Sequence, residues 1–162
     1  MSPWIFFDLD GVLRDLSGAV FGGDPEDWNI DLVERVNKDL DLLVRAETTG
    51  YVLSFFSFCG ESVIVSHQPP HWRKYTMQWI VRNLAPFVPE VVFVNHPRQK
   101  LDLIGDQGIL VDDFPFFDQK LDHIILVKHK YNECVAHKFR YVVNNEVELN
   151  QVLSGFVERR IK

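Results

Sequence analysis

The sequence predicts an α/β protein in which helices flank a parallel β-sheet, a Rossmann-like arrangement. Several short runs are apolar throughout, as expected for strands that are buried on both faces. These runs alternate along the chain with segments whose apolar residues recur at helical spacing. Polar residues follow the runs directly, at the position where α/β proteins bind their ligands. The length of 162 residues favours one domain over residues 1–162.

The first part of the chain is expected to form a strand, a loop and then helices. Residues 4–9 (WIFFDL) end at an Asp-Gly turn signal and are predicted to form a doubly buried strand. Residues 14–28 are rich in Gly, Asp and Pro and are predicted to form a loop or hairpin. Asn29 is a candidate N-cap for a helix with apolar residues at helical spacing through Leu43. Residues 51–59 suit either a helix or a strand, and we favour the helix.

The rest of the chain is expected to alternate between strands and helices. A helix is predicted to start at Pro69-Pro70, because proline is tolerated in the first turn. A last helix is predicted from about Glu146, with Asn144 or Asn145 as its cap. Its inward-facing residues are expected to be Val147, Val152, Leu153 and Phe156. The remaining strands are predicted at residues 62–65, 91–94, 108–111 and 123–127.

The composition of the chain indicates which partners it is expected to bind and in which cell compartment it is expected to lie. A net charge of −6, with 17 basic and 23 acidic residues, gives no general attraction toward nucleic acids. Cys59 and Cys134 are far apart and form no CxxC pair, so no disulfide framework is expected. We find neither a signal peptide nor an apolar run of membrane-spanning length, so a cytoplasmic protein without a membrane partner is expected.

Polar groups suited to phosphate chemistry follow four of the five predicted strands. Asp8 and Asp10 follow the first strand, and side chains two residues apart in an extended segment point the same way. Converging carboxylates repel each other unless a cation lies among them, and Mg²⁺ prefers such oxygen ligands. A hydroxyl and an ammonium group nearby would hold phosphate oxygens. The groups after the later strands are Ser66 and His67, then Asn95, His96 and Lys100, and then Asp112 and Asp113.

The segment FFDLDGVL, Ser66, Lys100 and the segment ILVDD together resemble the haloacid dehalogenase (HAD) superfamily of phosphotransferases over residues 4–127. The DLDGVL opening, the tryptophan in the loop after it and the ILVDD ending are most similar to the small 5'(3')-deoxyribonucleotidase branch. The resemblance implies a HAD fold in which residues 15–60, approximately, form a small helical cap. It also implies an Mg²⁺-dependent phosphomonoester hydrolase that acts on a nucleotide.

The resemblance assigns a role to each motif residue. Asp8 would be the nucleophile that forms an aspartyl-phosphate, and Asp10 would protonate the leaving oxygen and then activate water. Lys100 would pair with Asp8 and with the phosphate, although Arg98 is an alternative for this position. Ser66 and main-chain N–H groups near Gly11 would bind phosphoryl oxygens. The Mg²⁺ ligands would be the carboxylates of Asp8 and Asp112 and the main-chain carbonyl of Asp10, with Asp113 assisting.

Contacts to the rest of the substrate are expected from residues around these motifs. Arg14 and Trp28 lie in the loop that would cover the site, where Trp28 could stack on a nucleobase or simply pack on the body. His67 begins a segment, His67-Gln68-Pro69-Pro70, that departs from the family pattern. A mononucleotide is the favoured substrate. The alternatives are a nucleic-acid end, as in a polynucleotide 3'-phosphatase, and a HAD-fold protein that binds phosphorylated ligands without catalysis.

Overall fold

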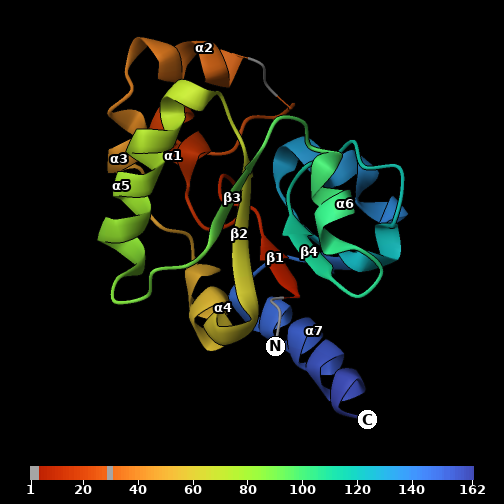
Figure 1. The fold of residues 1–162 in the computed structure, drawn as a ribbon. Coiled ribbons are helices and arrows are strands. Elements are labelled where there is room, and N and C mark those ends of the chain that lie inside the picture. Colours follow the sequence, from red (N-terminus) through yellow and green to blue (C-terminus); the bar gives the residue numbers. More distant parts are fainter. Residues whose placement is uncertain (1–3, 29–30) are drawn as a thin grey trace.

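A parallel β-sheet forms the centre of the molecule (Figure 1). The structure is a computed structural model that describes residues 4–28 and 31–162, so the predicted N-cap Asn29 lies outside the described residues. Within them the sheet has six strands in the order β3-β2-β1-β4-β5-β6, and every neighbouring pair is parallel. The predicted α/β fold class is therefore confirmed. The strands are β1 (Ile5–Phe7), β2 (Ser62–His67), β3 (Val91–Val94), β4 (Ile109–Asp112), β5 (Ile124–Val127) and β6 (Tyr141–Val143).

Strand β1 lies in the middle of the sheet, where β2 pairs with one of its edges and β4 with the other. Phe7 is paired with Ile64 of β2 on one side and with Val111 of β4 on the other. Alternate residues of the strands point to opposite faces, so Leu110 joins one hydrophobic cluster and Val111 another. The carboxyl ends of β1, β2 and β4 consequently lie side by side.

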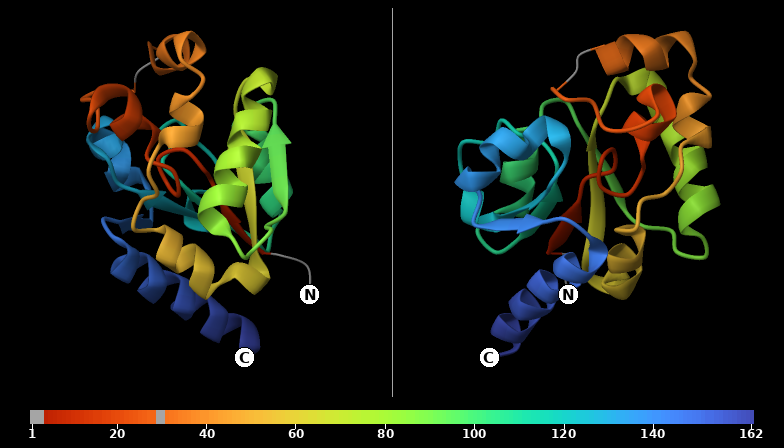
Figure 2. Two further views of the ribbon diagram at one scale, coloured as in Figure 1. Left: turned by 90° about the vertical axis from the view of Figure 1, so that its left-hand side faces the viewer. Right: turned by 180° about the vertical axis from the view of Figure 1, so that it is seen from behind.

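Helices cover both faces of the sheet (Figure 2). One apolar cluster joins the sheet to α4, α5 and α7, and another joins it to α6 and to the 3₁₀ segment η4. The α-helices are α1 (Leu16–Phe21), α2 (Asp31–Lys38), α3 (Leu42–Arg45), α4 (Val52–Ser57), α5 (Arg73–Leu84), α6 (Gln99–Ile104) and α7 (Glu146–Ile161). The 3₁₀ segments are η1 (Cys59–Glu61), η2 (Pro70–Trp72), η3 (Leu121–His123) and η4 (Lys130–Lys138). No helix within residues 4–28 and 31–162 is long and apolar enough to cross a membrane.

The segment between β1 and β2 differs from the prediction in two places. Helix α1 lies where a loop was expected: the Asp15 side chain accepts a hydrogen bond from the Gly18 N–H, and Gly22 ends the helix with φ 78°. The helix expected through Leu43 is divided into α2 and α3. Helices α1 to α3 share a small apolar core with α5, whereas α4 packs against α7 at the other end of the sheet (Figures 1 and 2). The helix favoured for residues 51–59 is confirmed by α4.

The C-terminal part of the chain contains α7 as predicted, with Asn145 as its cap. The Asn145 side chain accepts a hydrogen bond of 3.0 Å from the Glu148 N–H. The prediction that Val147 faces inward is wrong, because this side chain is 59% exposed and the helix turns Leu149 and Leu153 to the core. Strand β6 and segment η4 were not predicted. Cys59 and Cys134 are free thiols.

Candidate active site

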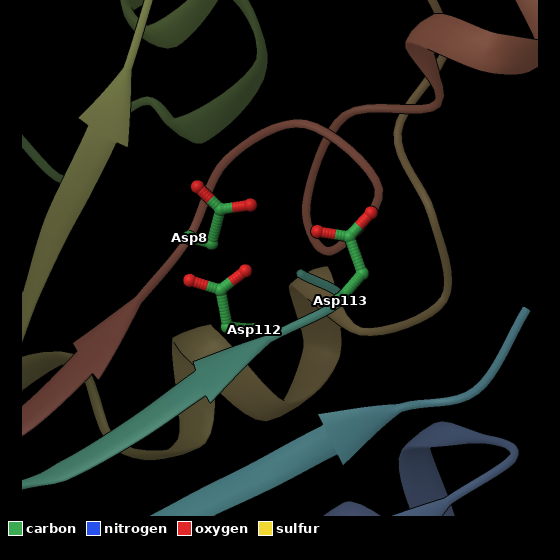
Figure 3. A group of neighbouring side chains, drawn as sticks. All are labelled: Asp8, Asp112 and Asp113. Carbon is green, nitrogen blue, oxygen red and sulfur yellow. The ribbon is translucent and has the colours of Figure 1, made fainter. Parts of the chain in front are cut away.

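Three buried carboxyl groups meet at the ends of β1 and β4, as Figure 3 shows. Asp8, Asp112 and Asp113 each offer an oxygen, and these oxygens lie within 4.8 Å of one another. The pairing of the two strands produces this arrangement, because the Asp8 N–H donates to the Val111 carbonyl at 2.9 Å. The two sequence motifs that are about a hundred residues apart are thereby brought to one point.

Lys100 reaches this cluster from helix α6. Its Nζ lies 2.8 Å from Asp8 Oδ1 and 2.7 Å from Asp112 Oδ2, and its side chain is only 4% exposed. Arg98, the alternative for the third motif, instead pairs with Asp118 at 3.1 Å, and both of these side chains are exposed. The structure therefore places Lys100, and not Arg98, in the site.

The electrostatics of the cluster are dominated by burial and by an excess of negative charge. Burial, and next the Asp112 carboxylate, raise the pKa of Asp8 well above its usual value. The same two causes raise the pKa of Asp113 to about 7. Burial opposes the ammonium form of Lys100, but the carboxylates of Asp112 and Asp8 outweigh it and raise the pKa of Lys100. One ammonium group among three carboxyl groups leaves a site whose charge and oxygen ligands fit a divalent cation such as Mg²⁺.

Asp113 is held by residues of η4 that sequence reasoning missed. The Tyr131 hydroxyl donates a hydrogen bond to the Asp113 carboxylate, and Asn132 Nδ2 donates to the Asp113 carbonyl at 2.9 Å. Burial, and next Asp113, raise the pKa of Tyr131, so the phenol remains a donor. No residue pattern in the sequence marks this segment, because a tyrosine and an asparagine after a strand are common in loops.

Asp10 lies apart from the three carboxyl groups and is bound by Arg14. Arg14 Nε and Nη2 contact the two Asp10 carboxylate oxygens at 2.6 and 2.9 Å. The Asp10 side chain is 24% exposed, whereas Arg14 is fully buried and also donates from Nη1 to the Leu43 carbonyl at 2.9 Å. Arg14, predicted to contact substrate, thus lies beneath the site and orients Asp10.

Gly11 makes the turn after β1 possible. Its φ is 83°, and a Cβ atom here would lie 2.0 Å from an Asp113 carboxylate oxygen. Its N–H donates to the Arg14 carbonyl at 2.9 Å, so this group is engaged within the turn. The Gly11 carbonyl lies 2.6 Å from His129 Nε2, and His129 Nδ1 lies 2.8 Å from Asp24. The loop before Trp28 is thereby tied to the turn that carries Asp10.

Ser66 and His67 end β2 on the other side of Asp8. Ser66 is 1% exposed, and its Oγ accepts a hydrogen bond of 2.8 Å from Gln68 Nε2. His67 lies at the surface, where partial desolvation, and next the Lys100 ammonium and His96, lower the pKa of its imidazole. In the segment that departs from the family pattern, His67 therefore lies at the rim of the site, and Gln68 is buried beneath it.

A cavity of about 630 Å³ opens above these groups. Its floor is polar and includes Asp8, Ser66, Lys100 and Asp112. Trp28 lines its wall, 40% exposed, and its ring contacts Phe114 and Tyr131 edge to face, each at 5.5 Å between centroids. The cavity thus joins a charged floor to an apolar wall, whose other members are Leu32, Val33, Pro69, Pro70, Trp72, Pro97 and Phe114.

Three solved structures superpose on this chain with TM-scores above 0.5. A phosphonoacetaldehyde hydrolase-like protein from Oleispira antarctica superposes with a TM-score of 0.58 at 11% identity, over 98% of this chain and 93% of that one. A haloacid dehalogenase-like hydrolase from Xanthomonas campestris gives 0.54 at 11% identity, over 96% of both chains. A haloacid dehalogenase-like hydrolase from Burkholderia xenovorans gives 0.54 at 13% identity, over 97% of this chain and 99% of that one.

These identities are too low to show more than a shared fold. No protein-family model and no curated protein sequence matches the chain. The fold is that of the haloacid dehalogenase-like hydrolases, in agreement with the resemblance of the motifs. The similarity to the deoxyribonucleotidase branch stays a prediction.

Proposed function

We propose that this protein is a Mg²⁺-dependent phosphomonoester hydrolase that acts through an aspartyl-phosphate at Asp8. The observation that carries the proposal is the buried group of Asp8, Asp112, Asp113 and Lys100 on the floor of an open cavity, with Asp10 two residues from Asp8. A nucleophile, a proton-transfer group, a cation for phosphate oxygens and a set of metal ligands are the parts that such a reaction needs.

The reaction would take place in two displacements. An Asp8 oxygen attacks phosphorus, the bond from phosphorus to the leaving oxygen breaks, and Asp10 supplies the proton that this oxygen takes up. A water molecule then attacks the same phosphorus, Asp10 accepts its proton, and the bond to Asp8 breaks to release inorganic phosphate. Lys100 and Ser66 hold phosphoryl oxygens while their charge grows.

Asp10 is placed to exchange protons at the cavity. Arg14 occupies two of the roughly four acceptor positions of the carboxylate, which leaves the others open to the cavity that Asp10 lines. The bidentate contact also restricts rotation of the Asp10 side chain, so that its free lone pairs keep one direction.

The residues that would hold Mg²⁺ are Asp8, Asp112 and Asp113. When bound, the ion would offset the charge of the three carboxylates and of the substrate phosphate. Tyr131 orients Asp113 for this role, as outer hydrogen bonds commonly do for metal ligands.

The substrate is proposed to be a nucleoside monophosphate, as in the 5'(3')-deoxyribonucleotidase-like branch. The apolar wall formed by Trp28, Trp72 and Phe114 supports this choice, because a planar base gains by packing against aromatic rings. The cavity volume of about 630 Å³ is in the range of sites that bind small molecules.

The experiment compares phosphate release from three substrates with and without Mg²⁺. We expect hydrolysis of an aryl phosphate and of a deoxynucleoside monophosphate by the wild type, and none by Asp8→Asn. A rate confined to a 3'-phosphorylated oligonucleotide would identify a polynucleotide 3'-phosphatase instead. Equal inactivity of wild type and Asp8→Asn across a broad phosphate panel would refute catalysis and leave a binding protein.

A further inference from the structure

We propose that Gln68 and Thr76 are positioning residues that make the Ser66 hydroxyl a hydrogen-bond donor toward a phosphoryl oxygen. The proposal rests on the proposed phosphatase function and deepens it. Neither residue belongs to the motifs that predicted the site, and Gln68 lies in the segment that departs from the family pattern. Both are buried, with Thr76 at 0% and Gln68 at 4% exposure.

A row of hydrogen bonds runs from Arg14 to Ser66, and all of them have the same direction. Arg14 Nη2 donates to Thr76 Oγ1 at 3.2 Å. Thr76 Oγ1 donates to Gln68 Oε1 at 2.8 Å, and Gln68 Nε2 donates to Ser66 Oγ at 2.8 Å. Thr76 and Gln68 thus each accept one hydrogen bond and donate another to the next residue toward the cavity.

The direction follows from the chemistry of the first member. A guanidinium group has five N–H donors and no acceptor, so Thr76 can only accept from Arg14. The hydroxyl proton of Thr76 is then available for Gln68, which must present its carbonyl oxygen to it. An amide with its oxygen toward Thr76 has its NH₂ group toward Ser66. The orientation of the Gln68 amide is therefore determined by Arg14, although the two ends of an amide have nearly the same shape.

Ser66 is the last residue in the row, and its hydroxyl proton is free to be donated to a ligand. Its Oγ accepts from Gln68, and among the described residues we find no protein acceptor for the Ser66 hydroxyl proton. The side chain lines the cavity beside Asp8 and Lys100, where the proposed substrate would place its phosphate. A phosphoryl oxygen is the acceptor that completes the row. With the opposite amide orientation, Ser66 would donate to Gln68 and offer the phosphate only a repulsive lone pair.

Arg14 positions both Asp10 and, through the row of hydrogen bonds, Ser66. Arg14 binds Asp10 with Nε and Nη2 and starts the row that ends at Ser66. It is fully buried, and its guanidinium carbon lies 5.6 Å from the centre of the Trp79 ring. Rigid placement of Arg14 consequently sets the proton-transfer group and the phosphate-binding hydroxyl together.

The test is a double-mutant cycle between Thr76→Val and Ser66→Ala. Valine keeps the volume of threonine but lacks the hydroxyl, so the Gln68 amide loses the contact that orients it. We expect Thr76→Val to lower both kcat/KM on an aryl phosphate and the affinity for inorganic phosphate by about 10-fold. Thr76→Ser, which restores the hydroxyl, should stay within about 2-fold of wild type, as should the exposed control Thr48→Val.

In the Ser66→Ala background, Thr76→Val should have no further effect beyond about 2-fold, because Thr76 acts only through Ser66. An equal loss in both backgrounds would overturn the proposal and assign Thr76 a role in folding or in placing Asp10. Unchanged activity and phosphate affinity in Thr76→Val would also overturn it. If Thr76→Val does not fold, Gln68→Met, which removes both amide contacts, carries the same expectations.

Phosphate binding separates this proposal from the proposed function. A wild type that binds inorganic phosphate, measured by titration calorimetry with Mg²⁺ present, but hydrolyses no ester would refute the phosphatase function alone. The affinities of the variants would then still decide the roles of Gln68 and Thr76. A wild type that neither binds phosphate nor hydrolyses esters would refute both.

Discussion

Replacing Asp113 with asparagine should stabilise the metal-free protein at pH 8. Asp113 is 4% exposed and lies beside two further carboxyl groups, so its ionised form is costly in the absence of a cation. Its pKa rises from the usual 3.8 to about 7, chiefly because of burial and next because of Asp112. An amide of almost the same shape removes this charge and still offers Tyr131 an oxygen to donate to.

The pKa shift gives the size of the effect. At roughly 1.4 kcal/mol per pH unit, the shift corresponds to about 4 kcal/mol of destabilisation once Asp113 is ionised in both states. The NH₂ group of asparagine must itself be buried, and a polar group without a full set of partners costs about 1–3 kcal/mol. The expected net gain in the free energy of unfolding is therefore about 1–3 kcal/mol.

The gain should depend on pH in a defined direction. Because the folded-state pKa of Asp113 is raised, the stabilisation of the wild type is complete below pH 3.8 and is lost as the pH rises through about 7. At low pH the electrostatic gain is absent and only the cost of the buried NH₂ group remains, so Asp113→Asn should be about 1–3 kcal/mol less stable than the wild type there. At pH 8 the variant should be the more stable of the two.

Urea unfolding of both proteins at pH 4.5 and pH 8, in chelator and in excess Mg²⁺, measures these differences. Mg²⁺ should stabilise the wild type more than the variant, because Asp113 is one of the proposed ligands of the ion in the folded state. The exposed Asp102→Asn serves as the control for the loss of one charge. A variant less stable than wild type at pH 8 in chelator, or a gain of the same size at both pH values, would refute the electrostatic reasoning.

Three further changes test the site. Lys100→Met should lower the free energy of unfolding in chelator by about 3–5 kcal/mol, because it leaves Asp8 and Asp112 unpaired, and an unchanged urea midpoint would contradict this. Tyr131→Phe should weaken Mg²⁺ binding, measured by titration calorimetry, by about 10–100-fold, and equal affinity would show that the Asp113 contact is dispensable. Trp28→Ala should raise KM for a deoxynucleoside monophosphate about 10-fold but leave KM for glycerol phosphate unchanged; an equal rise for both would argue against a base contact.

The central strands and their polar ends could be predicted because both signals are local. A strand buried on two faces is apolar at every position, and Asp8, Ser66 and Asp112 each follow such a run directly. Parallel strands place their carboxyl ends at one edge, so the position in the sequence already implies proximity. Lys100 lies on a helix rather than at a strand end, so the sequence left Arg98 as an alternative, and the contacts of Lys100 with Asp8 and Asp112 separate the two.

The supporting residues could not be predicted, because their patterns are short or irregular. Helix α1 has six residues, too few for a periodic signal, although Asp15 and Gly22 mark its ends. Segment η4 is a 3₁₀ stretch of three residues per turn, which a search for helical spacing does not find. The row from Arg14 to Ser66 joins three separate parts of the chain. Nothing in the order of its residues shows that they meet.

The central position of β1 also has a consequence for how the molecule assembles. Ile5 pairs with Ser62 of β2 and with Ile109 of β4, a partner more than a hundred residues further along the chain. Contacts over such separations form slowly, because a long loop must close before they contribute. Until β4 docks, one edge of β1 is open to pairing with another chain. The carboxylate cluster is complete only when β4 has paired with β1, because Asp112 and Asp113 lie at the end of β4. A cation that binds the cluster would therefore stabilise the completed sheet relative to its aggregation-prone precursor.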